Sequence, residues 1–167
     1  MKPRIGIILG SDSDFPILEK GIRLLRDWGI PFRIEVSSAH RTPERTVRVV
    51  QGFAASGVRV IIAAAGGAAH LAGIVAAHTL LPVLAVPVPS ALSGLDSLLS
   101  MVQMPSGVPV ATFGIGDSGG TNAVLLALEI LALDDAAIRK RLQEFRRQQE
   151  ETVAAKSRSL QQKIDGG

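Results

Sequence analysis

The chain of 167 residues contains no cysteine and no tyrosine, and aromatic residues make up only 4% of it. Without cysteine there can be no disulfide scaffold, thiolate zinc site, iron–sulfur cluster or cysteine nucleophile. The scarcity of aromatic side chains disfavours a flavin sandwich and a surface that stacks single-stranded nucleic acid. What is abundant instead is Ala, Val, Leu and Ile, the composition of a parallel sheet covered on both faces.

Charged residues are also absent from residues 60–95, a run of 36 residues. A membrane-spanning helix needs about 20 predominantly apolar residues without strong breakers. Gly66, Gly67, Pro82 and Pro87 interrupt this run, so it predicts buried strands and a small-residue helix. Residues 1–4 lead into a strand without the apolar segment of a signal peptide, and we therefore expect a cytoplasmic protein that does not bind membranes.

The net charge is +3, and much of the positive charge lies near the end of the chain. The basic residues there are Arg139, Lys140, Arg141, Arg146, Arg147, Lys156, Arg158 and Lys163. Gln and Glu are interspersed among them and no aromatic stripe accompanies them. We interpret this segment as a solvated helical face and expect no nucleic-acid partner.

Hydrophobic runs and helical periodicity alternate along the chain. Strands are predicted at residues 4–9, 32–36, 58–64, 82–88 and 108–113. Helices are predicted at residues 15–28, 43–56, 68–79, 95–102, 122–133 and from 136 to about 156. This alternation is typical of βαβ units. We predict an α/β fold: a three-layer αβα sandwich with a five-stranded or slightly larger parallel sheet, flavodoxin- or Rossmann-like, plus a C-terminal helix.

No repeat, linker or low-complexity stretch divides the chain, so residues 1–167 are predicted to form one domain. Residues from about 134 to 160 would be a helical extension with Ile138, Leu142 and Phe145 on one face. That face could pack on a neighbouring subunit or fold back on the chain's own sheet. The sequence alone leaves both arrangements open.

Polar and small residues follow each of the first three predicted strands. Ligands of doubly wound sheets bind beyond the carboxyl ends of the strands, and a strand order of 2-1-3-4-5 would bring these three loops together. The first loop, with Ser11, Ser13 and Asp14, suits a sugar hydroxyl or phosphate, although helix capping by Ser13 or Asp14 explains it equally well. We interpret Asp14 as a ligand of ribose hydroxyls, and Ser11 and Ser13 as the polar rim.

The second loop combines Ser38, His40 and Arg41 directly before Thr42, the expected N-cap of a helix that starts at Pro43. A hydroxyl, a titratable imidazole and a guanidinium able to grip phosphate form a stronger signal than the first loop.

The third loop offers approachable backbone around Gly66 and Ala69 before His70, although His70 could simply cap its helix. His78 is interpreted as structural. The chain lacks the GxGxxG and GxxxxGK[ST] fingerprints of dinucleotide and phosphate-binding loops. With three histidines in no ligand spacing, a metal site is not expected.

Long motifs in and around these loops resemble the PurE family, the N5-carboxyaminoimidazole ribonucleotide mutases of purine biosynthesis. The motifs are GSDSD (10–14), SSAHRTP (37–43), AGGAAHLAG (65–73), LPVLAVPV (81–88) and DSLLSMVQMPSGVPVAT (96–112). They occur in the family's order and at compatible spacing, and the resemblance extends from residue 5 to about 133. It implies an isomerase that moves a carboxyl group from the exocyclic nitrogen of an imidazole ribonucleotide to ring carbon C4, through trapped CO2 and aminoimidazole ribonucleotide.

The resemblance also implies roles for particular residues. His40 matches the family's catalytic histidine, which would act first as acid and then as base, and His70 is expected to be catalytic with it. The expected substrate-binding set is Ser11, Ser13, Asp14, Ser38, Arg41, Gly66 and Ala69. Neither a metal nor an organic cofactor is expected. A homo-octamer is implied, and the substrate could be handed over by the ATP-dependent synthetase that makes it.

Two segments depart from the family pattern. Ala72 stands where the family usually has proline, and residues 89–94 are about one residue shorter than usual, so the closing of these loops could differ. Two alternatives remain open: an aminoimidazole ribonucleotide carboxylase that uses CO2 directly, and a non-catalytic nucleotide-binding module of flavodoxin-like fold.

Overall fold

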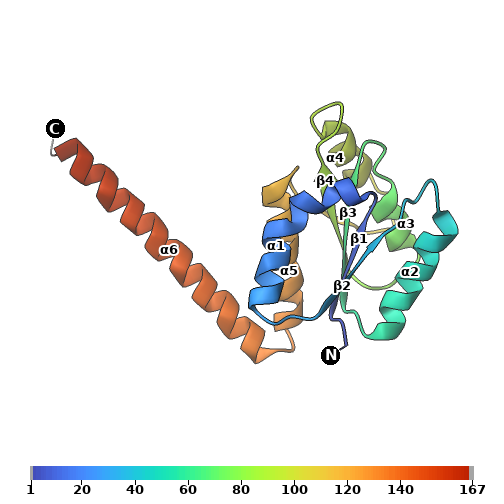
Figure 1. Ribbon diagram of the computed structural model, residues 1–167, viewed down its shortest axis with the longest axis horizontal. Helices are drawn as coiled ribbons and strands as arrows, with labels where there is room; N and C mark the ends of the chain where they lie inside the picture. Colours follow the sequence, from blue (N-terminus) through green and yellow to red (C-terminus); the bar gives the residue numbers. More distant parts are fainter. Residues whose placement is uncertain (1, 166–167) are drawn as a thin grey trace. The chain divides into compact units, whose positions relative to one another are not determined.

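The computed structural model describes residues 2–165, which divide into two compact units with a boundary between Ala127 and Leu128. The first unit contains a five-stranded parallel sheet in the order β2-β1-β3-β4-β5 (Figure 1). The strands are β1 (Ile5–Leu9), β2 (Phe32–Val36), β3 (Val60–Gly66), β4 (Val83–Val88) and β5 (Ala111–Thr112). The helical elements are η1 (Asp12–Asp14), α1 (Phe15–Asp27), α2 (Pro43–Ser56), α3 (Leu71–Ala77), α4 (Leu95–Val102) and α5 (Asp117–Ala132). The α/β sandwich predicted from the sequence is confirmed, and the strand order is the one that would bring the three loops together.

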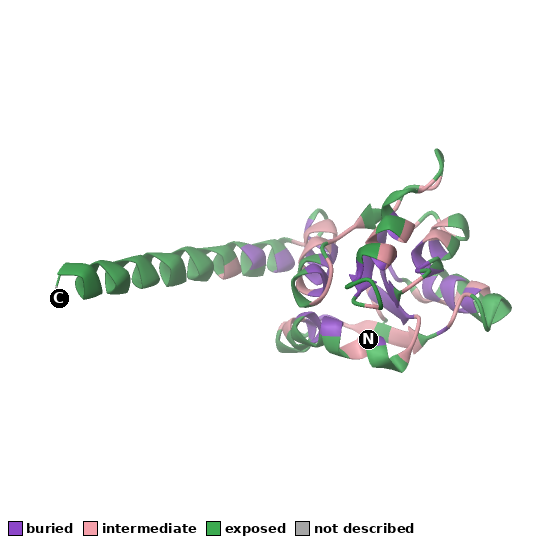
Figure 2. Cartoon of the chain, turned by 90° about the horizontal axis from the view of Figure 1, so that it is seen from above, coloured by how far each residue is buried: buried purple, intermediate pink, exposed green. Residues whose placement is uncertain are grey.

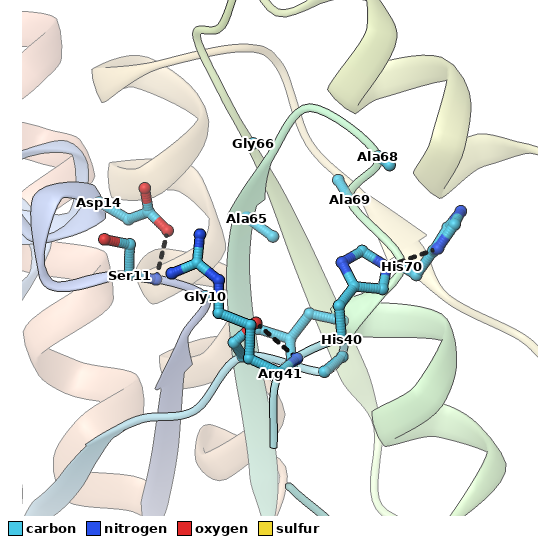
Figure 3. A pocket seen from close by; sticks show the side chains of 13 residues that line it. Gly10, Ser11, Asp14, His40, Arg41, Ala65, Gly66, Ala68, Ala69 and His70 are labelled. Carbon is cyan, nitrogen blue, oxygen red and sulfur yellow. Dashed lines mark hydrogen bonds between the residues drawn. The ribbon is translucent and has the colours of Figure 1, made fainter. Parts of the chain in front are cut away.

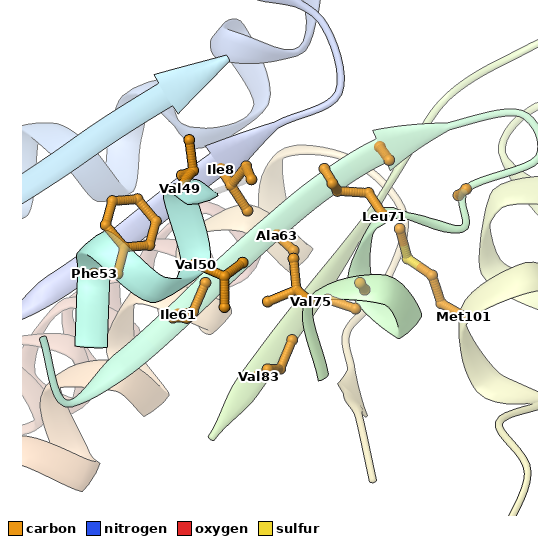
Figure 4. Packing of buried hydrophobic residues seen from close by; sticks show 14 of the residues in the cluster. Ile8, Val49, Val50, Phe53, Ile61, Ala63, Leu71, Val75, Val83 and Met101 are labelled. Carbon is orange, nitrogen blue, oxygen red and sulfur yellow. The ribbon is translucent and has the colours of Figure 1, made fainter. Parts of the chain in front are cut away.

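Helices cover both faces of this sheet: α1 and α5 lie on one side, and α2 and α3 on the other (Figure 1). On the second side, alternate residues of the strands meet the apolar stripes of the helices (Figure 4). Phe53 of α2 lies directly over Gly6 of β1, because a Cβ atom at Gly6 would stand 2.6 Å from the Phe53 ring. The strands β3 and β4 are buried along almost their whole length, as central strands of a parallel sheet should be.

On the opposite side, α1 and α5 approach so closely that only glycine fits at their crossing. A Cβ atom at Gly120 would lie 2.2 Å from the Ile17 carbonyl oxygen, and one at Gly21 would lie 2.6 Å from Val124. This contact explains why α5 begins at Asp117, before the predicted start at residue 122. Gly119 and Gly120, which the sequence places before the predicted helix, form the first turn of α5 because packing against α1 stabilises that turn.

The edge strand β2 carries an ionic cluster on its exposed side. Glu35 accepts hydrogen bonds from Arg33 at 2.7 Å and from Arg45 of α2 at 3.0 Å. The Arg33 guanidinium also lies 5.8 Å from the centre of the Phe53 ring. Charged side chains therefore extend from the edge strand β2 on the face of the sheet that α2 covers.

The second unit consists of the end of α5, from Leu128, and the helix α6 (Ala136–Asp165). Arg139 donates hydrogen bonds to the carbonyl oxygens of Ala132 and Leu133, which satisfies the end of α5. Ile138 and Leu142 are buried, whereas α6 is exposed over residues 146–165 (Figure 2). The helix is longer than the predicted end near residue 156.

Other predicted boundaries need smaller corrections. The strand predicted at 108–113 is only two residues long. The helix predicted at 68–79 is confined to α3, because Ala69 and His70 form tight turns that precede it. Thr42 stands at the N-cap of α2, as predicted, but its hydroxyl donates to the Ser38 carbonyl oxygen instead of capping the helix.

Among residues 2–165, no helix combines the length and apolarity that crossing a membrane would require.

Candidate active site

A pocket of about 270 Å³ opens where β1, β2 and β3 end (Figure 3). The three loops that follow these strands line it, because the strand order places β1 between β2 and β3. The lining residues are Gly10, Ser11, Asp14, Ser38, Ala39, His40, Arg41, Ala65, Gly66, Ala68, Ala69, His70 and Leu71. This is the position at which doubly wound sheets bind their ligands.

The first loop is held by reciprocal hydrogen bonds between Ser11 and the residues that follow it. The backbone N–H of Ser11 donates to the Asp14 carboxylate at 2.9 Å, and the Ser11 hydroxyl accepts from the backbone N–H of Ser13 at 3.3 Å. The capping residue is therefore Ser11, with Asp14 as its partner, rather than Ser13 or Asp14. Burial raises the pKa of the Asp14 carboxyl; the Ser11 N–H bond lowers it in part, and nearby Asp12 adds to the rise.

The second loop is a compact turn organised by Ser38. Its hydroxyl accepts from the backbone N–H of Arg41 at 3.2 Å, and its carbonyl oxygen accepts from the backbone N–H of Thr42 at 2.8 Å. Beneath the turn, the buried hydroxyls of Ser37 and Thr46 lie 2.9 Å apart. The Arg41 side chain extends toward the loop of Gly10 and Ser11 (Figure 3). A guanidinium in that position can bind an anion bidentately.

The third loop brings backbone close to the pocket. Gly67 adopts a φ of +66°, in the left-handed region that favours glycine. Two tight turns follow, in which the N–H of Ala69 bonds to the Gly67 carbonyl oxygen and the N–H of His70 to that of Ala68. Ala69 is buried, and Gly66 and Ala68 present small surfaces to the pocket.

The second and third loops meet through their histidines. Nε2 of His40 lies 2.8 Å from Nδ1 of His70, and the rings stand nearly perpendicular, at 83° (Figure 3). A hydrogen bond between two ring nitrogens needs one donor and one acceptor, so one proton is shared along this contact. His70 makes no side-chain capping bond to α3, which excludes the capping interpretation of this residue.

The structure brings together nearly all of the residues that the sequence singled out. Ser13 lies outside the pocket lining, where its hydroxyl donates to that of Ser11 at 2.8 Å. Residues 89–94, the segment that is shorter than usual in the family, do not line the pocket either. Ala72, the substitution for proline, is buried in the first turn of α3.

Further lining residues were not predicted: Gly10, Ala39, Ala65, Ala68 and Leu71. They are small or apolar residues. Only their position beside the predicted residues in the sequence could have indicated that they line the pocket.

Residues 4–152 match the family described as AIR carboxylase. The chain belongs to the AIR carboxylase family. The resemblance drawn from the sequence motifs is thereby confirmed.

Individual members of the AIR carboxylase family are similar over nearly the whole chain. A Pyrococcus horikoshii protein named N5-carboxyaminoimidazole ribonucleotide mutase is 49% identical over 96% of this chain and 90% of its own length. The phosphoribosylaminoimidazole carboxylase of Saccharomyces cerevisiae is also 49% identical over 96% of this chain, but over only 28% of its own length. The crystal structure of Treponema denticola PurE superposes with a TM-score of 0.85 at 29% identity, covering 95% of this chain and 98% of that one.

Candidate metal ligands do not gather within residues 2–165 of this member of the AIR carboxylase family. Within the part of the chain that the structure describes, no group of three or more His, Asp and Glu side chains could hold a metal ion. The polar groups of the pocket are instead hydroxyls, one carboxyl, one guanidinium and the two imidazoles.

The buried carboxyl of Asp14 predicts a pH-dependent cost in stability. Because its native pKa is raised above the value of 3.8 expected when unfolded, the native state holds this proton more tightly. Stability falls as the pH rises from near 3.8 through the raised native pKa, and the charged form remains costly above it. We expect Asp14→Asn, which keeps an oxygen acceptor for Ser11, to raise the thermal unfolding midpoint at pH 7, with the gain disappearing below about pH 4.

Thermal unfolding of both proteins between pH 3 and pH 8 measures this effect. Asp12→Asn, at an exposed neighbour in the same turn, is the control. It removes only the smaller, electrostatic contribution to the raised pKa of Asp14 and should give a much smaller gain than Asp14→Asn. A gain for Asp14→Asn that is equally large at every pH would contradict the explanation.

Proposed function

We propose that this protein is an N5-carboxyaminoimidazole ribonucleotide mutase, an isomerase of purine biosynthesis. The observation that carries the proposal is the contact between His40 and His70 at the wall of a pocket that also holds Arg41 and Asp14. A proton carrier, an anion-binding cation and a hydroxyl-binding carboxyl are the groups that carboxyl transfer on a ribonucleotide needs. The mutase name of several close relatives supports the same assignment.

In the proposed complex, the phosphate binds to Arg41 and to the Ser38 hydroxyl, and Ser13, which lies outside the pocket lining, stays at the rim beside Ser11. The ribose hydroxyls bind to the Asp14 carboxylate and to Ser11, one loop away. The imidazole ring then lies along Gly66 and Ala69, where small residues allow a flat ring to approach the backbone. The carboxyl group that migrates faces the histidine pair.

The proposed chemistry uses His40 twice. The imidazolium donates a proton to the exocyclic nitrogen as the bond from that nitrogen to the carboxyl carbon breaks, which leaves an amine and CO2. Ring carbon C4 then attacks CO2, and neutral His40 accepts the C4 proton as aromaticity returns. Protons balance without an outside donor or acceptor, and no cofactor is needed. His70 accepts or donates at the far nitrogen and so holds the tautomer that each step requires.

The deciding experiment compares initial rates of formation of the C4-carboxylated product from two substrate mixtures, without ATP or metal. One mixture contains the N5-carboxylated ribonucleotide, and the other the uncarboxylated ribonucleotide with bicarbonate. We expect a strong preference for the first. A preference for the second would identify a carboxylase, and no product from either would leave only a nucleotide-binding module.

The carboxylase alternative has one specific observation in its favour. The yeast relative named as a carboxylase and the archaeal relative named as a mutase are both 49% identical to this chain. Sequence identity therefore does not distinguish the mutase from the carboxylase, whereas the rates with the two substrate mixtures do.

An octamer forms part of the same proposal, because the site is open in the single chain. His40, Gly66, Ala68 and His70 are exposed, whereas escape of CO2 or entry of water would abort the transfer. The exposed apolar side chains on and before α4 offer a surface for neighbouring subunits: Leu92, Leu95, Leu99 and Val102. We expect light scattering to give the mass of eight chains.

The remaining parts of the proposal concern the chain as a whole. Residues 1–167 would act as one PurE-like domain whose extension, from about 134 to 160, packs on a neighbouring subunit. The exposed Val153, Leu160 and Ile164 in α6 support such packing. We place the enzyme in the cytoplasm, where it would receive its labile substrate from the ATP-dependent synthetase.

Arg41 provides a separate prediction for the phosphate site. Arg41→Lys keeps the positive charge but loses the two-pronged geometry, so the affinity for the ribonucleotide should fall by about 1–3 kcal/mol, or roughly 5- to 150-fold. The fold should be intact because the side chain is exposed. Isothermal titration with aminoimidazole ribonucleotide measures the change, and an unchanged dissociation constant would remove Arg41 from the phosphate site.

A further inference from the structure

Ser97 of α4 lies outside the pocket but is bonded to the loop that forms one of its walls. Its side chain is fully buried. The hydroxyl donates to the Val88 carbonyl oxygen at 2.8 Å and accepts from the backbone N–H of Gly67 at 3.0 Å. One hydroxyl thus joins the end of β4 to the residue that follows β3.

The two bonds of Ser97 determine the direction of a peptide group in the pocket wall. Because the single hydroxyl hydrogen goes to Val88, a lone pair faces Gly67 and holds its N–H toward α4. In a trans peptide the preceding carbonyl points the opposite way, so the Gly66 carbonyl is directed away from α4. Gly67 has a φ of +66° and no side chain that would restrict its rotation, so the hydroxyl supplies a constraint that the glycine itself lacks.

The direction of that peptide is passed along the loop to His70. Only two residues separate Gly67 from His70, and tight hydrogen bonds of 2.8 Å and 2.6 Å span the segment. Rotation at Gly67 would therefore displace the His70 ring. The contact of 2.8 Å between the two imidazoles would then be lost.

Ser97 is itself held in place from both sides. Ser90 donates a hydrogen bond to the Asp96 carboxylate at 2.6 Å, which anchors the start of α4 to the preceding loop. Ser100 donates to the Asp96 carbonyl oxygen at 2.7 Å and lies 3.5 Å from the Gly67 carbonyl oxygen. The hydroxyl at position 97 therefore approaches Gly67 from a fixed helix rather than from a mobile loop.

We propose that Ser97 is a positioning residue for catalysis, which orients the Gly66–Gly67 peptide and thereby keeps His70 in hydrogen-bonding reach of His40. The inference rests on the proposed function for its kinetic consequence. The ribose and phosphate contacts of the proposed complex belong to the other two loops, and only the imidazole ring lies along the loop that Ser97 holds. Loss of the Ser97 hydroxyl should therefore slow the chemical steps and leave binding of the ribonucleotide largely intact.

The test compares Ser97→Ala and Ser97→Cys with the wild type, using kcat and KM on the N5-carboxylated ribonucleotide. We expect kcat to fall about 10- to 100-fold in Ser97→Ala, because displacement of a catalytic group by about 1 Å has effects of this size. KM should stay within about threefold. Ser97→Cys, whose thiol is somewhat larger than the hydroxyl and a weaker hydrogen-bonding group, should be intermediate, and it tests the proposal if the alanine variant fails to fold.

Thr112→Val is the matched control. The Thr112 hydroxyl donates to the Met101 carbonyl oxygen and so also anchors α4, but near its last residue and with no bond of its own to Gly67. Its kcat should stay within about twofold of the wild type. An equal loss in this control would show that general loosening of α4 explains the effect, and a wild-type kcat in Ser97→Ala would overturn the proposal outright.

Amide hydrogen exchange of a peptide covering residues 66–70 supplies a readout that does not depend on activity. We expect faster exchange there in Ser97→Ala and not in Thr112→Val. If the wild type proves inactive on both substrate mixtures, the proposed function fails, and exchange alone then tests the positioning. Unchanged exchange in Ser97→Ala would refute it.

Discussion

Replacement of His40 by asparagine should reduce turnover by about 10²- to 10⁴-fold, the usual contribution of a general acid–base group. Asparagine keeps a hydrogen-bonding side chain of similar reach but cannot carry a proton from the exocyclic nitrogen to C4. Because His40 is exposed, the variant should fold normally. Its affinity for aminoimidazole ribonucleotide should stay within about fivefold, since Arg41 and Asp14 remain.

The chain provides its own control in His78, the histidine that is not part of the pocket. His78 is exposed at the end of α3, and it does not line the cavity. His78→Asn should leave turnover unchanged. Full turnover in His40→Asn with retained binding would eliminate the catalytic assignment and favour the non-catalytic module.

The second large effect concerns the crossing of α1 and α5. Gly120→Ala should lower the free energy of unfolding by about 3 kcal/mol, because the new Cβ atom would stand 2.2 Å from the Ile17 carbonyl oxygen. The Ile17 carbonyl group cannot move away from the new Cβ atom unless α1 and α5 separate. Thermal unfolding at equal protein concentration measures the loss.

Gly52→Ala is the opposite case and serves as the control. Gly52 is also helical, in α2, but a Cβ atom added there would meet no other atom within 4 Å. Alanine at this position should stabilise the protein by about 0.5–1 kcal/mol, since it restricts the unfolded chain and favours the helix. A destabilisation by both substitutions would refute the explanation from close approach.

The sequence predicted the elements whose pattern is local. Largely apolar runs place β1, β3 and β4, and the Thr-Pro start places α2, because each signal lies within the element itself. The predicted start of α5 was wrong because its signal is not local. The first turn of this helix is stabilised by contact with α1, about a hundred residues earlier in the chain. No local propensity favours a helix through Gly119 and Gly120.

The candidate site likewise contains residues that the sequence identifies locally and contacts that only the folded chain creates. His40, Arg41 and Asp14 stand out by residue type and by their place after strands, and the strand order brings their loops together. The bond between His40 and His70, and the contact of Ser97 with Gly67, each join residues 30 positions apart. Such pairings depend on the angles of loops, which no periodicity in the sequence encodes.

The ionic cluster on β2 has a consequence for colloidal behaviour. An edge strand presents unpaired backbone groups that invite another sheet to add to it, and charged side chains are a common protection against such aggregation. Arg33, Glu35 and Arg45 lie along that edge and would have to be desolvated before a foreign strand could pair. The charged side chains on β2, the strand that leads into the turn of His40 and Arg41, should therefore disfavour pairing of this edge with a strand of another molecule.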